Sequence, residues 1–158
     1  MAHLAPAAAQ EDMMKIKQAM TGEVCVATPD ETIQKVAQLM LGLDIGMIPV
    51  AHEDKLVGAI TDRDIAVRGV AAGRGPETLV RDIMTTDMKY CFDDDDIESV
   101  LENLGEIQLR RLPVVNREKR LVGIVSLSDF ARSQIPEKTG AALGDIARPG
   151  GEHSQAAF

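Results

Sequence analysis

The sequence contains few aromatic residues, few cysteines and no long apolar run. Of its 158 residues only 3% are aromatic, none is tryptophan, and two are cysteines, Cys25 and Cys91. The core must therefore be aliphatic. No stretch approaches the ~18 consecutive apolar residues that a membrane span requires, so we expect no membrane partner. The first ten residues lack a basic segment ahead of an apolar one, which makes them a poor secretory signal. We therefore expect reduced thiols and a cytoplasmic protein.

The charge is acidic, at 17 Lys and Arg against 25 Asp and Glu, or 17 − 25 = −8. This balance argues against nucleic acid as a partner, because neutralising phosphates requires clustered Lys and Arg. An apolar fraction of 45% with 27% charged residues is typical of a globular domain. The length suits one compact domain or two small halves that share a core.

An internal repeat is the strongest signal in the chain. Three landmarks recur at an offset of 64 residues and a fourth at 65. They are Met20-Thr21 with Met84-Thr85, Ile33–Val36 with Ile97–Val100, Met47–Val50 with Arg111–Val114, and Leu56–Ile60 with Leu121–Val125. One inserted residue accounts for the change of offset, so the two halves are expected to share one fold.

Each half predicts the same order of elements. A β-prone run (24–27; 90–92) precedes a helix with apolar residues at helical spacing, then two β-prone runs that would form a hairpin (47–51 and 56–60; 112–115 and 121–125), then a second helix (62–70; 128–133). We expect the first helix to begin at Thr28, with Glu31 completing a capping box. Its counterpart would begin within residues 93–96, four consecutive aspartates that suit the positive end of a helix dipole.

These patterns predict an α+β fold of two β-α-β-β-α repeats, packed with pseudo-twofold symmetry. The expected boundaries are a flexible segment at 1–12, repeat 1 at 13–76, repeat 2 at 77–134 and a mostly flexible tail at 135–158, with a short helix around Ala141–Ala147. About 60 residues is marginal for a lone domain. The two repeats should therefore bury their strands against each other.

The chemically suggestive motif is Gly58-Ala-Ile-Thr61-Asp-Arg-Asp64, mirrored as Gly123-Ile-Val-Ser126-Leu-Ser-Asp129. One interpretation is purely structural, because a hydroxyl followed three residues later by an acid is a helix-capping arrangement. The other is a binding site, in which the carboxylate accepts both hydroxyls of a ribose and the Thr or Ser adds one more hydrogen bond. The two glycines would then let a ligand approach the backbone closely.

The doubled order of Met-Thr, amphipathic helix, hydrophobe-Pro-Val and Gly-x-x-Thr/Ser-x-x-Asp resembles a pair of CBS domains (cystathionine-β-synthase-type repeats), the Bateman module. The resemblance covers roughly residues 13–134. The chain is similar to small stand-alone bacterial CBS pairs, including those of the hypoxic response protein type.

The resemblance implies a non-catalytic regulatory module with two clefts between the repeats. Such clefts bind adenosine-containing ligands: AMP, ADP, ATP, NAD or S-adenosylmethionine. It places Thr61 and Asp64 on the ribose in one cleft, which we expect to be the stronger site, and Ser126 and Asp129 in the other. The remaining implied residues are Ile48, Pro49, Leu112 and Pro113 as apolar walls and backbone contacts for adenine, and Arg63 and Arg111 as phosphate partners.

The resemblance further implies a homodimer that forms through the repeat helices and signals to an unknown effector protein by a change of repeat angle or dimer packing. No catalytic cofactor is expected, since none of the three histidines has an evident nucleophile to serve. Two alternatives remain open: a protein-interaction module with empty clefts, and a thiol- or metal-responsive stress protein using Cys25 and Cys91. The aspartates at 93–96 could likewise bind a divalent cation instead of capping a helix.

Overall fold

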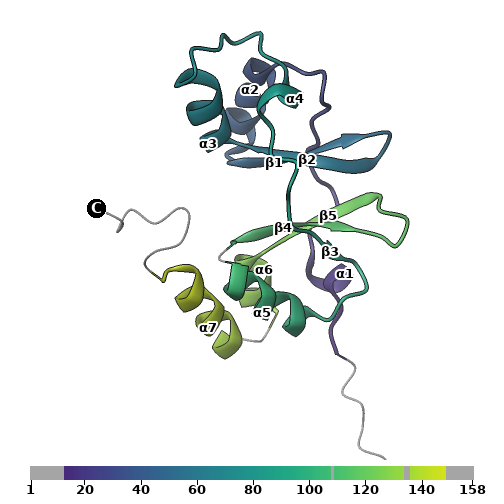
Figure 1. The fold of residues 1–158 in the computed structure, drawn as a ribbon. Coiled ribbons are helices and arrows are strands. Elements are labelled where there is room, and N and C mark those ends of the chain that lie inside the picture. Colours follow the sequence, from purple (N-terminus) through teal and green to yellow (C-terminus); the bar gives the residue numbers. More distant parts are fainter. Residues whose placement is uncertain (1–12, 108, 134–135, 149–158) are drawn as a thin grey trace, which may run out of the picture.

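The computed structural model describes residues 13–107, 109–133 and 136–148. Two units, each a small sheet covered by helices, stack sheet against sheet (Figure 1). Unit 1 contains α2 (Ile33–Leu43), β1 (Met47–His52), β2 (Lys55–Thr61), α3 (Asp62–Asp64), the π-helix η1 (Ile65–Val70) and α4 (Val80–Ile83). Unit 2 contains α1 (Ile16–Ala19), β3 (Cys91–Phe92), α5 (Ile97–Ile107), β4 (Arg111–Val115), β5 (Leu121–Ser126), α6 (Leu127–Arg132) and α7 (Pro136–Ile146). The predicted α+β fold of two repeats is confirmed.

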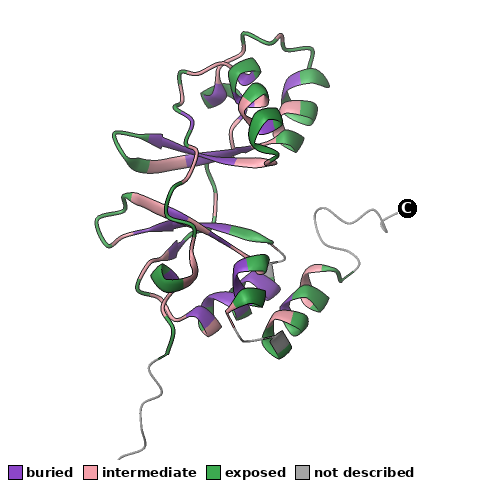
Figure 2. Cartoon of the chain, turned by 180° about the vertical axis from the view of Figure 1, so that it is seen from behind, coloured by how far each residue is buried: buried purple, intermediate pink, exposed green. Residues whose placement is uncertain are grey.

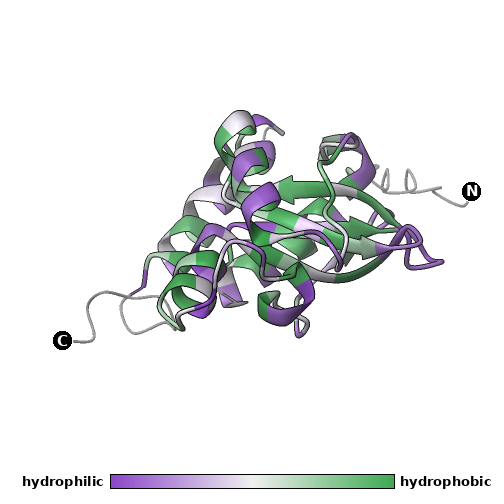
Figure 3. Cartoon of the chain, turned by 90° about the horizontal axis from the view of Figure 1, so that it is seen from above, coloured by the Kyte–Doolittle hydropathy of each residue, from purple (hydrophilic) through white to green (hydrophobic). Residues whose placement is uncertain are grey.

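Both predicted hairpins form where the sequence places them. β1 pairs antiparallel with β2, β4 pairs antiparallel with β5, and β3 adds to β4 in parallel. The strands and the inner faces of the helices are buried, whereas the hairpin turns are exposed (Figure 2). Seen from above, the strands are the most hydrophobic part of the chain and the hairpin turns are hydrophilic (Figure 3). The β-prone run 24–27 differs from its prediction, because only Ala27 pairs with β1, through an isolated bridge to Val50.

The first long helix starts later than predicted. Thr32 is the N-cap of α2, and its hydroxyl accepts a hydrogen bond from the Lys35 amide at 3.3 Å. The Glu31 carboxylate does accept from the Thr28 amide at 2.8 Å, but this contact closes a turn ahead of the helix. The Ile33 amide donates instead to Thr78 O, in the segment that leads to α4. The prediction of a helix starting at Thr28 is therefore wrong, because a contact distant in sequence takes the amide that the first turn would have used.

The first short helix of each repeat packs in the unit formed by the other repeat. Ile16 of α1 is fully buried in the core of unit 2 with Cys91, Leu101 and Phe130. Val80 of α4 is equally buried in the core of unit 1. The boundary expected near residue 76 separates the two repeats in sequence, but the packed units do not follow it. Residues 15–21 of repeat 1 contact unit 2, and residues 79–85 of repeat 2 contact unit 1.

The helix expected around Ala141–Ala147 forms, and it begins five residues earlier, at Pro136. We expected residues 135–158 to be mostly flexible, yet α7 runs from Pro136 to Ile146 and buries Ala142 in the core of unit 2. The reason is a small residue on the partner helix: a Cβ at Gly105 of α5 would lie 3.3 Å from the Ala142 Cα, so the two helices approach closely. Residues 1–12 and 149–158 lie outside the described residues.

The repeated glycines hold the two units together. Thr21 exchanges two backbone hydrogen bonds of 2.9 and 3.0 Å with Ile124, and Thr85 exchanges two of 2.8 and 2.9 Å with Ala59. A Cβ at Gly123 would lie 2.7 Å from Thr21 O, and one at Gly58 would lie 2.7 Å from Thr85 O. The expectation that a ligand would approach these glycines is therefore wrong. The Met-Thr segment of the other repeat occupies that space.

This close approach makes Gly123 sensitive to the smallest possible enlargement. Gly123→Ala should lower the free energy of unfolding by about 1–3 kcal/mol, the usual effect of overpacking a well-packed site. Chemical denaturation measures this change. Gly42→Ala is the matched control, because no atom lies within 4 Å of a Cβ at this position in α2. The control should raise stability by about 0.5–1 kcal/mol. Equal stability of Gly123→Ala and the unmodified protein would refute the proposed role of the glycine.

Candidate functional site

Both hydroxyl-acid pairs cap helices. The Thr61 hydroxyl accepts from the Asp64 amide at 3.0 Å, and the Asp64 carboxylate accepts from the Thr61 amide at 3.0 Å. In unit 2 the Ser126 amide and hydroxyl both donate to Asp129 Oδ2, at 2.8 and 3.0 Å. The capping interpretation is thus correct for both motifs. Whether a motif can also bind a ligand depends on the space beside it.

Open space lies beside the second motif. A cavity of about 280 Å³ is bordered by Ser126, Asp129, Arg111 and Arg132 of unit 2. The first half of the chain supplies the other walls, through Ile45 and Met47 near β1 and through the crossing segment Thr21–Cys25. The cavity therefore lies between the two units, and both repeats contribute to its walls.

Asp129 is the buried charge of this cavity, with only 7% of the residue exposed. Its Oδ2 accepts both Ser126 hydrogen bonds, and its Oδ1 accepts from Arg132 Nη2 at 2.5 Å. A carboxylate offers about four acceptor positions, so one remains for a ligand. The Arg132 side chain is largely exposed and can turn away to free a second.

The first motif is arranged differently. Asp64 Oδ1 lies 3.7 Å from Arg68 Nε, and Arg68 also donates to the carbonyl oxygens of Ile83 and Met84 at 3.3 Å. Arg68 thus ties η1 to α4. Arg63 is exposed on α3, and its backbone amide donates to the carboxylate of Asp62.

The hydrophobe-Pro segments differ from their predicted role. The Ile48 and Leu112 side chains are buried in the separate cores of units 1 and 2. Neither can form a side-chain wall for adenine, so that prediction is wrong for these two residues. Pro49 and Pro113 are buried within β1 and β4, and backbone contacts from these strands stay a prediction. The apolar walls of the cavity come instead from Val24, Ile45, Met47 and Ile124.

Sequence reasoning missed Arg132 and Cys25. Arg132 follows Asp129 by three residues, a helical spacing that could have indicated the pair. At the equivalent position of repeat 1 stands Val67 (132 − 65 = 67). Cys25 enters the wall only because the N-terminal segment crosses to unit 2, which no local pattern indicates.

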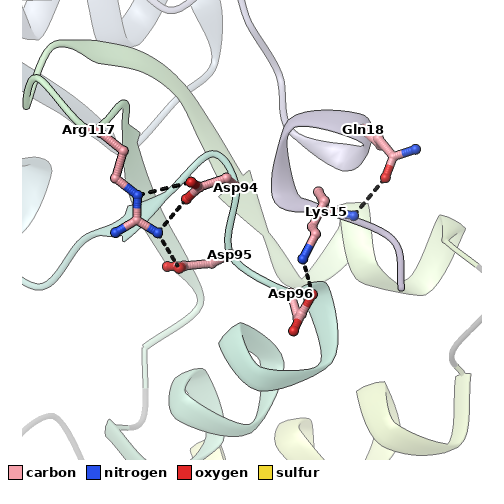
Figure 4. Close-up of polar contacts among 6 residues, drawn as sticks. All are labelled: Lys15, Gln18, Asp94, Asp95, Asp96 and Arg117. Carbon is pink, nitrogen blue, oxygen red and sulfur yellow. Dashed lines mark hydrogen bonds and ion pairs between the residues drawn. The ribbon is translucent and has the colours of Figure 1, made fainter. Parts of the chain in front are cut away.

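The four aspartates at 93–96 are largely paired with cations (Figure 4). Arg117 Nη2 lies 2.6 Å from Asp94 Oδ1 and 3.7 Å from Asp95 Oδ1, while Lys15 Nζ lies 2.5 Å from Asp96 Oδ1. The hydrogen bond from Arg117 lowers the pKa of Asp94, and the hydrogen bond to Asp96 raises the pKa of Lys15. α5 begins immediately after the run, at Ile97. The predicted start of this helix therefore agrees with the structure, whereas the Ile97 amide donates to Met14 O and not to an aspartate side chain.

Within the described part of the chain, no cluster of three or more His, Cys, Asp or Glu residues could hold a metal ion. Cys91 is buried, and its burial raises the pKa of the thiol to about 12. Cys25 is half-buried and packs against the core of unit 1, whereas Cys91 lies in the core of unit 2. No helix in the described residues is both long and apolar enough to cross a bilayer.

Comparison with known proteins identifies the family. The CBS-domain family model matches twice, at residues 16–69 and 80–135, so the chain belongs to the CBS-domain family and carries a pair of these domains. It is 39% identical over 135 residues to the CBS domain-containing protein YhcV of Bacillus subtilis, covering 85% of this chain and 96% of that protein. It is 42% identical over 118 residues to hypoxic response protein 1 of Mycobacterium tuberculosis, covering 73% and 80% of the two chains.

Solved structures agree with this assignment. The crystal structure of Hypoxic Response Protein I with two coordinated zinc ions superposes with a TM-score of 0.68 at 36% identity, covering 75% of this chain and 98% of that one. The CBS domain pair of protein MJ0100, solved in complex with 5′-methylthioadenosine and S-adenosyl-L-methionine, gives a TM-score of 0.68 at 25% identity over 79% and 98% of the chains.

Proposed function

We propose that this CBS pair is a non-catalytic regulatory module that binds an adenosine-containing ligand in the cavity beside Ser126 and Asp129. The observation that carries the proposal is a buried carboxylate on the wall of a cavity of about 280 Å³. This volume is near the lower end of the usual range for small-molecule pockets, ~300–1,000 Å³. The complex of MJ0100 with 5′-methylthioadenosine and S-adenosyl-L-methionine supports the choice of ligand class.

The charges around the cavity suggest which ligands to test. Asp129 would accept the ribose hydroxyls, as acidic residues do in other nucleotide sites. Arg111 and Arg132 offer two guanidinium groups to a phosphate, whereas Glu23, also in the wall, suits a cationic group. AMP and S-adenosylmethionine are therefore the most informative pair of ligands. The Thr61/Asp64 cleft, which the sequence favoured, remains a second candidate site.

The position of the cavity gives the ligand a way to signal. Its walls include Met47 of unit 1 and Asp129 of unit 2, so a bound molecule would contact both units. Binding would favour whichever relative angle of the units makes those contacts best. The size of the signal is limited to the difference in the ligand's affinity for the two arrangements. The effector that receives the signal and the cytoplasmic location stay predictions.

Titration calorimetry with AMP and S-adenosylmethionine tests the ligand class and the site together. The variant Asp129→Asn keeps an oxygen that can accept from the Ser126 amide but loses the charge. A hydrogen bond to a charged group contributes about 1.5–3 kcal/mol, so affinity should fall roughly tenfold or more.

Asp64→Asn is the matched control, because it makes the same change in the other capping box. It should bind as the unmodified protein does. Loss of affinity in Asp64→Asn alone would move the site to the other cleft, contrary to the proposal. A folded protein that binds neither ligand would exclude the adenosine-sensing function and favour the protein-interaction alternative.

The predicted homodimer has a candidate surface on unit 1. Leu41 and Leu43 of α2 and Val67 and Val70 of η1 are exposed, Leu41 by 84%. The position equivalent to Leu41 in repeat 2 is Gly105 (41 + 64 = 105), and α7 covers it. In unit 2, α7 covers this face of α5, whereas the corresponding face of α2 in unit 1 is exposed. We propose that a second copy of the chain covers it, unit 1 against unit 1.

Leu41→Lys should shift the protein from dimer to monomer, because it places a charge in the apolar contact. Sedimentation equilibrium measures the molecular mass directly. Leu143→Lys is the control, since Leu143 is also exposed but lies on α7 of unit 2. That variant should stay dimeric. A monomeric unmodified protein, or a dimer that survives Leu41→Lys, would contradict this interface.

A further inference from the structure

A second, smaller cavity lies away from the proposed ligand site, toward the turns of the two hairpins. The hairpins extend to the same side of the molecule (Figures 1 and 2), and the Leu121 amide donates to Asp54 O at 3.0 Å across them. The cavity has a volume of about 160 Å³. Its apolar walls come from both units: Leu56 and Val57 of β2, Met88 of the connecting segment and Val115 of β4.

Lys119 and Tyr90 supply polar groups to this cavity. Lys119 Nζ lies 3.3 Å from the Tyr90 hydroxyl oxygen and 5.7 Å from the centre of the tyrosine ring. The turn fixes the lysine in place, because Asn116 Oδ1 accepts from the amides of Glu118 and Arg120 at 3.0 Å each. Lys119 itself adopts a left-handed backbone with φ of 63°.

Lys119 differs from its neighbours in how its charge is compensated. Arg117 pairs with Asp94 at 2.6 Å, and Arg120 pairs with Asp54 at 3.3 Å. For Lys119, by contrast, no carboxylate of the described residues lies within 4.0 Å, and its partner is a neutral phenol. A phenol compensates a cation far less well than a carboxylate does. The ammonium group at the cavity therefore retains its capacity to bind an anion.

We infer that this cavity binds a small organic anion with an apolar body, such as a short-chain monocarboxylate. The carboxylate would accept from Lys119 Nζ and from the Tyr90 hydroxyl, and the alkyl chain would contact Leu56, Val57 and Val115. At about 160 Å³ the cavity is little more than half the size of the one beside Asp129, at about 280 Å³, and it lies among different residues. The site is therefore distinct from the adenosine site in both place and chemistry.

The equivalent positions of repeat 1 do not carry the polar residues of this site. At the equivalent positions of repeat 1 stand Asp54 (119 − 65 = 54) and Val26 (90 − 64 = 26). An aspartate repels an anion, and valine has no donor. The Tyr90–Lys119 pair is therefore present in repeat 2 and not in repeat 1.

Tyrosine fluorescence tests the inference directly, because Tyr90 is the chain's one tyrosine and tryptophan is absent. Sodium hexanoate is the probe, added to the full-length protein at constant sodium concentration. We expect a saturable change in emission as the carboxylate displaces the hydroxyl from Lys119. Hexan-1-ol, which has the same chain and no charge, should give none.

Lys119→Gln should weaken hexanoate binding at least fivefold, whereas Lys17→Gln, the same charge change on α1, should leave it unaltered. Asp129→Asn should also leave it unaltered, since that residue lines the other cavity. The inference is overturned if hexanoate gives no saturable change, if hexan-1-ol binds equally well, or if Lys119→Gln binds hexanoate as the unmodified protein does.

Discussion

Two backbone contacts between the repeats determine most of this structure. At each, the threonine of a Met-Thr pair exchanges two hydrogen bonds with the strand residue after a glycine, Ile124 or Ala59 of the opposite repeat. Only glycine permits the approach, since any Cβ at position 58 or 123 would lie 2.7 Å from a carbonyl oxygen. The contacts carry α1 into the core of unit 2 and α4 into the core of unit 1. Neither repeat therefore completes its core alone, which agrees with the marginal stability expected of ~60 residues.

The same crossing creates the cavity that we propose as the ligand site. Because residues 21–25 run along unit 2, they form a wall opposite Asp129, and Ile45 and Met47 of unit 1 form another. Because its walls come from both units, the shape of this cavity depends on how the two units are arranged. The pseudo-symmetry also allows the two sides to diverge. Arg111 and Arg132 line the cavity where repeat 1 has Met47 and Val67 (111 − 64 = 47; 132 − 65 = 67), so one duplicated scaffold presents different chemistry on its two sides.

The sequence was sufficient for features that depend on local patterns. The β-prone runs joined by polar turns predicted the hairpins. The apolar spacing of Ile97, Val100, Leu101 and Leu104 predicted α5, because burial on one face of a helix dictates this spacing. The capping boxes were also visible as hydroxyl-acid pairs. The start of α2 was not, because a carbonyl at Thr78 takes the Ile33 amide. A helix was expected around Ala141–Ala147, but the packing of α7 on α5 was hidden, since it depends on the small Gly105 of another helix.

The residues of the candidate site were likewise predicted only in part from the sequence. Ser126, Asp129 and Arg111 were predicted and do border one cavity, whereas the Ile48 and Leu112 side chains lie in the cores instead. Cys25 was missed because it reaches the cavity through a contact between segments that are distant in sequence. Arg132 was missed because it lies beyond the motif, on the same helical face as Asp129. Whether a capping residue can also bind a ligand depends on its burial and on the open space beside it. Both follow from the tertiary packing and not from a local sequence pattern.

Cys25 makes the central claim directly measurable, because the half-buried residue lines the cavity proposed to bind the adenosine-containing ligand. Cys91 provides an internal reference, since it is buried and its pKa is raised to about 12, which leaves little reactive thiolate. The measurement is the rate of Cys25 alkylation by iodoacetamide, resolved by peptide mass spectrometry, with and without AMP or S-adenosylmethionine. The account predicts that one of these ligands slows alkylation of Cys25 several-fold and leaves Cys91 unchanged. Equal Cys25 rates with and without both ligands, at concentrations that saturate binding, would show that the cavity between the repeats is not where the ligand binds.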